Sequence, residues 1–245
     1  NNDYAKGFRR DVRKNVIGHK GILLQVKGKD SEGKLDEKLN ESVEKAFKLW
    51  GKRKNCTIDG RTDWVRLQKI VINTVVASGE SFVRIIEGVD AGPWGFSLQV
   101  LDPLRIPVQM NENRLSNGNV IRNGIEMTSF GRPIAYYAEV KAGALADPFR
   151  FGGKEFERIE ARNMLHIFDQ TDAEQYRGIP WTATSLRRLR NLNGVEEAVV
   201  INARSTASKT MVLEADADVY DVEDDAGEPE VSIEPNEVIV LPPGY

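Results

Sequence analysis

Few side chains of this 245-residue chain are suited to acid–base, nucleophilic or metal chemistry. The chain has two histidines, His19 and His166, and a single cysteine, Cys56. With one thiol it can form neither an internal disulfide nor a multi-cysteine zinc site. There is no G-x-S-x-G motif, and Ser81 has no obvious base partner in the sequence. We therefore predict no catalytic residue, no metal site and no cofactor.

The remaining chemical candidates have ordinary explanations. His166 and Asp169 are three apart in a strand-like segment, where alternation separates them onto opposite faces, so we expect a packed or hydrogen-bonded histidine. His19 lies in a glycine-flanked turn and should be exposed. Residues 152–154 (GGK) lack the spacing of a phosphate-binding loop, which favours a flexible loop. Cys56 follows a basic run that could lower its pKa, but no second thiol or histidine lies nearby.

Charge is distributed unevenly along the chain. The net charge is −3, which excludes a generic polyanion binder, yet residues 1–20 hold six basic and two acidic residues. Residues 214–237 hold eleven acidic residues and no basic one. Such a block is typical of a solvated loop, and it could also contact a basic partner. A calcium site is the weakest alternative, because the spacing does not match the calcium-binding loop pattern.

Hydrophobic periodicity predicts an α+β domain in which helices mostly precede an antiparallel sheet. Helices are expected over 3–16, 35–50 and 64–78, the last capped by Thr62 or Asp63 and ended by Gly79. Strands are expected over residues 22–26, 81–87, 96–101, 120–127, 133–140 and 164–168. The helix over 64–78 should bury an apolar stripe made of Trp64, Leu67, Ile70, Val71, Thr74 and Val75.

The pattern changes after residue 181. Residues 182–209 are helical in period throughout, with an apolar face and a polar face that carries Arg187, Arg190 and Arg204. A long two-faced helix must pack either within its own chain or on neighbouring copies. Strand-like runs over 211–213, 231–233 and 237–241 surround the acidic block. We therefore divide the chain into an α+β domain (1–180), a long helix (181–209) and a β-rich tip (210–245) that is incomplete at its C-terminal end.

A series of segments resembles the lambda-type family of phage portal proteins. The segments lie at residues 9–22, 50–53, 61–68, 78–84, 101–106, 131–136, 166–168, 175–181 and 241–244. Their order and approximate spacing match over nearly the whole chain, although no single motif is decisive. The chain also begins at Asn1 rather than Met, so we expect a piece of a longer protein, without the family's later helix, channel loop and crown.

The resemblance implies a structural role. Portal proteins of tailed phages form a dodecameric ring at one capsid vertex, through which double-stranded DNA is packaged and ejected without sequence specificity. By analogy, residues 1–180 resemble the wing, 181–209 a stem helix and 210–245 the clip. The implied partners are other copies of the chain, the terminase large subunit, head-completion or connector proteins and the capsid protein, but no membrane. The implied location is the virion, after assembly in the bacterial cytoplasm.

The resemblance also suggests roles for the charged residues. Arg187, Arg190 and Arg204 would line the DNA channel, or they would pair with carboxylates between subunits. The tip would dock partners through Asp221, Glu223, Asp224 and Asp225. Two other functions stay open at this point, a stand-alone DNA-binding module and, with less support, an enzyme of phage processing. The enzyme would need a nucleophile with a base partner, and the sequence offers none.

Overall fold

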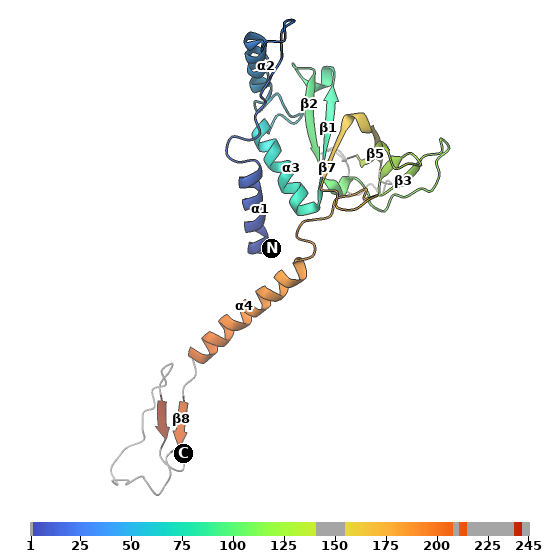
Figure 1. Ribbon diagram of the computed structural model, residues 1–245. Helices are drawn as coiled ribbons and strands as arrows, with labels where there is room; N and C mark the ends of the chain where they lie inside the picture. Colours follow the sequence, from blue (N-terminus) through green and yellow to red (C-terminus); the bar gives the residue numbers. More distant parts are fainter. Residues whose placement is uncertain (1, 141–154, 208–210, 215–237, 242–245) are drawn as a thin grey trace, which may run out of the picture. The chain divides into compact units, whose positions relative to one another are not determined.

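The computed structural model describes residues 2–140, 155–207, 211–214 and 238–241 (Figure 1). The chain divides into two compact units, formed essentially by Asp3–Ser185 and by Leu186–Tyr245. The first unit is a mixture of helices and antiparallel sheets, which confirms the predicted α+β class. The second contains a helix and a pair of short strands.

Three helices open the first unit, namely α1 (Asp3–Val16), α2 (Glu37–Trp50) and α3 (Trp64–Ser78). Asp36 caps α2 and Asp63 caps α3, each by accepting a hydrogen bond from a first-turn backbone N–H. Gly79 ends α3 in the left-handed conformation, with φ +91°, as glycine readily does. The cap and the end predicted for the third helix are thus confirmed.

Two antiparallel sheets follow the helices. The first has the order β2-β1-β7, with β1 (Glu80–Glu87), β2 (Phe96–Leu101) and β7 (Met164–Phe168). The second has the order β3-β4-β5-β6, with β3 (Val120–Arg122), β4 (Ile125–Met127), β5 (Pro133–Glu139) and β6 (Phe156–Glu160). Single 3₁₀ turns lie at η1 (Val89–Ala91), η2 (Pro103–Arg105) and η3 (Ala161–Asn163).

The first sheet has a hydrophobic core on each face. Val83 and Leu98 pack with Trp50 and Leu67 on the face that α3 covers. Phe82 points the other way and belongs to a second core shared with the second sheet, made of Phe82, Leu101, Ile106, Ile125, Met127, Tyr136, Ala138, Ile159 and Met164. Strand alternation therefore divides the residues of β1 between two cores.

The structure corrects several details of the sequence prediction. Residues 22–26 form no strand, because side chains of α2 and α3 bind their backbone, as when Gln68 accepts from the Ile22 N–H at 2.7 Å. The strand predicted over 120–127 is a hairpin, since Asn123 and Gly124 both adopt positive φ. In the predicted stripe Leu67 and Val75 are buried, whereas Ile70 is exposed. Strand β6 was missed because its only buried residue is Ile159.

The second unit begins with α4 (Leu186–Ala207), four residues later than predicted because residues 182–185 form turns. Strands β8 (Met211–Glu214) and β9 (Val238–Leu241) pair in parallel. The strand-like run predicted over 231–233 and the loop predicted over 142–153 lie outside the described residues.

Truncation of Leu67 to alanine should lower the free energy of unfolding by about 2–5 kcal/mol, because its side chain is 4% exposed in the core beneath α3. Thermal denaturation followed by circular dichroism measures the effect. Val89→Ala is the control, since Val89 is 97% exposed. Equal melting temperatures for the two variants would show that α3 is not packed on the sheet.

Candidate functional site

A buried cluster of three charged or ionisable side chains joins distant segments of the first unit. Glu80 at the start of β1 binds His166 of β7 through Oε2 and Nε2, which are 2.9 Å apart. The Arg177 guanidinium donates to the same carboxylate, with Nη2–Oε1 at 2.6 Å. The three side chains are only 5–11% exposed. We call Glu80, His166 and Arg177 the clamp.

Arg177 extends the clamp to the second sheet. Its guanidinium donates to the backbone carbonyls of Asn123 at 2.6 Å and Ile106 at 3.2 Å. The Gly178 N–H also donates to Glu80 Oε2 at 3.0 Å. The planar guanidinium thus connects β1, the turn after β2 and the β3–β4 hairpin through donors of fixed geometry.

Two backbone segments lie in direct contact next to the clamp, one at Gly79 and the other at Gly178. Gly79 and Gly178 lie so close that a Cβ atom on either would collide with the backbone of the other segment. Three residues further on, the Trp181 N–H donates to the Val76 carbonyl of α3 at 3.3 Å. Residues 177–181, which precede α4 in the sequence, are therefore fastened to the α3–β1 junction.

The chemistry of the clamp is structural. Burial raises the pKa of Glu80, but the hydrogen bonds from His166, Arg177 and Gly178 outweigh it, and the pKa lies below its usual value. Hence Glu80 is an anion whose oxygens are occupied. His166 stacks on Phe82 with centroids 4.3 Å apart, which confirms the predicted packed histidine. Ser81 points to the opposite face of β1, so no serine–histidine pair forms here.

A second buried carboxylate stabilises the four-stranded sheet. Glu126 of β4 is 1% exposed and binds Arg158 Nε at 2.8 Å. It also accepts hydrogen bonds from the side chains of Asn117, Asn119 and Tyr137. Arg158, as the largest contributor, together with Asn119 and Asn117 lowers the pKa of Glu126 to about 2, against the opposing effect of burial.

The lowered pKa of Glu126 predicts a dependence of stability on acid. Because the folded pKa is about 2 and the model-peptide value is 4.5, this carboxylate stabilises the fold above pH 4.5. Its contribution should be lost as the pH falls from 4.5 to 2. Urea unfolding across this range measures the loss, and Glu126→Gln should flatten the pH profile there. An unchanged profile in the variant would contradict the assignment.

Two of the other sequence candidates, Cys56 and His19, can be placed in the structure. Cys56 is fully buried, its thiol donates to the Thr62 carbonyl, and burial raises its pKa to about 11. The nearby basic run therefore does not activate it. His19 is exposed. Residues 152–154 lie outside the described residues.

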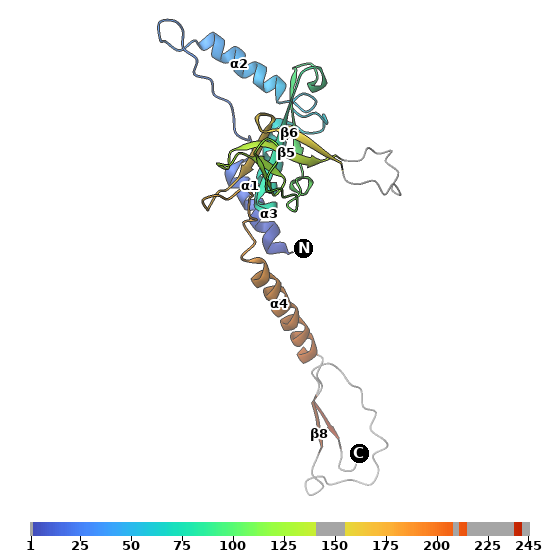
Figure 2. The same cartoon turned by 90° about the vertical axis from the view of Figure 1, so that its right-hand side faces the viewer.

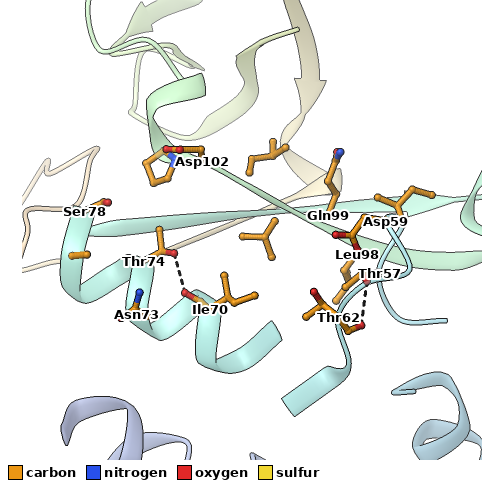
Figure 3. A pocket seen from close by; sticks show the side chains of 15 residues that line it. Thr57, Asp59, Thr62, Ile70, Asn73, Thr74, Ser78, Leu98, Gln99 and Asp102 are labelled. Atoms are coloured by element: carbon orange, nitrogen blue, oxygen red, sulfur yellow. Dashed lines mark hydrogen bonds between the residues drawn. The ribbon is translucent and has the colours of Figure 1, made fainter. Parts of the chain in front are cut away.

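A polar cleft of about 540 Å³ lies between α3, β2 and the loop before α3 (Figure 3). Its hydroxyls bond to carbonyls, as Thr57 does to Thr62 and Thr74 to Ile70. Its carboxylates accept from nearby backbone N–H groups, and no basic side chain lines it. Both carboxylates of the cleft, Asp59 and Asp102, therefore serve to hold local turns of the backbone.

An apolar groove of about 600 Å³ lies between the end of α1, α3 and β7. Helix α3 covers β1 and β2 but leaves β7 open, so large apolar side chains line the groove while still reaching solvent. These side chains are Val16, Ile22, Leu165, Ile167 and Trp181. The sequence pattern did not predict this surface.

The charged residues suggested by the resemblance do not come together in one site within the described residues. Arg187, Arg190 and Arg204 are exposed on α4. The acidic positions Asp221, Glu223, Asp224 and Asp225 lie outside the described residues. Among the described residues, no group of three or more histidine, cysteine or acidic side chains could hold a metal ion. None of the described helices is long and apolar enough to cross a membrane.

The buried charged side chains of the first unit join segments that are distant in the sequence. Residues 1–245 match the lambda family of phage portal proteins. The chain is also 35% identical over 222 residues to the probable portal protein of Halomonas phage phiHAP-1, which covers 90% of this chain and 42% of that protein. The chain therefore belongs to the lambda portal family, a family of structural phage proteins, and spans about two fifths of the length of that curated relative.

Proposed function

We propose that the protein containing this chain forms a ring at one vertex of the capsid and conducts double-stranded DNA during packaging and ejection. The match of residues 1–245 to the lambda portal family carries this proposal. The ring would be dodecameric. It would bind the terminase large subunit, head-completion or connector proteins and the capsid protein, and it would itself hydrolyse nothing.

The proposed division follows the architecture of such a ring. Residues 1–180 act as the wing, 181–209 as the stem helix and 210–245 as the clip. The clamp supports this division, because it fastens residues 177–181 to the α3–β1 junction through Glu80 and Gly178. A wing that must hold a stem helix under load needs a rigid attachment at this point.

Light scattering on the full-length protein tests the ring, since the particle mass of a dodecamer should be twelve times the subunit mass. DNA affinity separates the ring from a stand-alone DNA-binding module. A module that neutralises phosphates shows a steep fall of affinity with salt, whereas tight phosphate contacts would stall a conduit. A monomer with a steep salt dependence would contradict the proposal.

The acidic tip is proposed to dock protein partners, because its charge repels the DNA duplex. Neutralising Asp221, Glu223, Asp224 and Asp225 to the matching amides should slow docking of terminase or head-completion protein at low ionic strength. The expected decrease in association rate is about tenfold, since electrostatic steering raises such rates by 10–10³. Stopped-flow kinetics measure it, and unchanged rates at low salt would refute the docking role.

A further inference from the structure

Helix α2 and the segment before it form an arm with an uncovered apolar side. The arm consists of residues 23–43, which are the extended segment before α2 and the first half of α2. It projects from the rest of the first unit (Figure 2). Side chains of α2 hold that segment, because Glu44 accepts from the Val26 N–H at 3.0 Å and Asn40 accepts from the Gly28 N–H at 2.8 Å. The arm is thus an ordered element.

One apolar face runs along α2 and is only half covered. At its root, Trp50 is 7% exposed and packs in the core beneath α3. Further out on the same face, Val43 and Leu39 are 40% and 51% exposed. The exposed apolar side chains of the arm are Leu23, Leu24, Leu35, Leu39 and Val43.

The arm cannot cover the groove of its own chain. At one end Gln68 binds both the N–H and the carbonyl of Ile22. At the other end the Trp50 indole donates to the Phe96 carbonyl at 3.0 Å. Both ends are therefore fixed to the body, and the arm points away from it in Figure 2. Each chain consequently presents a protruding apolar surface and a concave one.

We propose that the arm of one subunit packs into the apolar groove of the neighbouring subunit. This inference rests on the proposed ring. Contact between two different surfaces of the same chain is head-to-tail, and a head-to-tail contact closes into a ring when its rotation permits. It therefore supplies the kind of interface that a portal needs, with the arm and the groove as its two halves.

The exposed apolar area is large enough to form the centre of an interface. The five apolar side chains of the arm and the five of the groove are each 40–65% exposed. With roughly 100 Å² for an aliphatic side chain, they leave on the order of 500 Å² of apolar surface in solvent. Exposed apolar patches of a few hundred Å² mark interaction sites on soluble proteins, and polar residues at the rim supply the rest of such an interface.

Cross-linking in trans tests the proposal on the full-length protein. Subunits carrying Leu39→Cys are assembled with subunits carrying Ile167→Cys and treated with a short bismaleimide. Native Cys56 contributes little background, because its thiol is buried. Phe130→Cys replaces Ile167→Cys as the control, since Phe130 is 98% exposed and lies outside the groove. We expect about tenfold more cross-linked dimer from the arm–groove pair than from the control pair.

Three results would overturn the proposal. Wild-type rings with no excess cross-linking over the control would refute the arm–groove contact while leaving the ring intact. Efficient cross-linking of Leu39→Cys subunits alone would indicate arm-to-arm pairing instead. If the wild-type protein forms no ring, the proposed function itself fails.

As an independent measurement, Leu39→Glu with Val43→Glu should prevent ring assembly without lowering the melting temperature. Normal rings from this double variant would contradict the proposal.

Discussion

Replacing Glu80 by alanine will destabilise the first unit by about 3–5 kcal/mol, the usual cost of removing one partner from a buried ion pair. The substitution leaves the Arg177 guanidinium buried with carbonyl partners alone and frees the Gly178 N–H. It should also loosen residues 177–181, so their amides should exchange faster with deuterium. Urea unfolding measures the first effect and hydrogen exchange the second.

The matched control is Glu157→Ala. Glu157 forms a similarly short ion pair with Arg84, at 2.6 Å, but its side chain is 41% exposed. Removing an ion pair so open to solvent typically costs about 0–1 kcal/mol. If the two variants lose equal free energy of unfolding, burial does not make the Glu80–Arg177 ion pair stronger than the exposed one, and the assigned role of the clamp is wrong.

Reversing two arginines of α4, Arg190→Glu with Arg204→Glu, should leave ring assembly intact and reduce packaged DNA per head by about tenfold. The reason is that a ring repeats each arginine once per subunit and so turns it into a girdle of positive charge facing phosphates. Packaging of DNA into purified empty heads measures the effect. Arg188→Glu is the control, because Arg188 lies on the opposite side of the helical wheel.

The same experiment separates the two roles suggested for these arginines. If Arg190 and Arg204 pair with carboxylates of a neighbouring subunit, the double variant should fail to form rings. Intact rings with normal packaging would refute both the channel role and the pairing role. Negative-stain images of the variant therefore have to accompany the packaging assay.

Capping residues, apolar periodicity and terminal glycines correctly predicted the elements whose bounds depend on neighbouring residues in the sequence. Helix α3 has an Asp63 cap, an apolar period and a terminal Gly79, and the structure confirms its bounds. Strand β7 was also predicted at its observed residues. The strand predicted over 22–26 was wrong, because its β-branched and leucine residues are equally compatible with an extended segment held by side chains of α2 and α3.

Pairings between distant segments could not be predicted from the sequence. Alternation along β7 separated His166 from Asp169, but it could not show that β1 lies beside β7 and brings Glu80 to His166. Arg177 binds Glu80 across 97 residues. The available signal was the pair of glycines, Gly79 and Gly178, each next to one of these charged residues. The apolar groove was missed because it consists of residues from six separate segments.

We expect the full-length protein to assemble into a portal ring. Negative-stain electron microscopy of the purified full-length protein tests it most directly, because class averages show the symmetry and the channel together. We expect closed rings with a central hole and one repeat per subunit. A monodisperse population of monomers or compact dimers, without a hole, under conditions where the first unit is folded, would contradict this expectation.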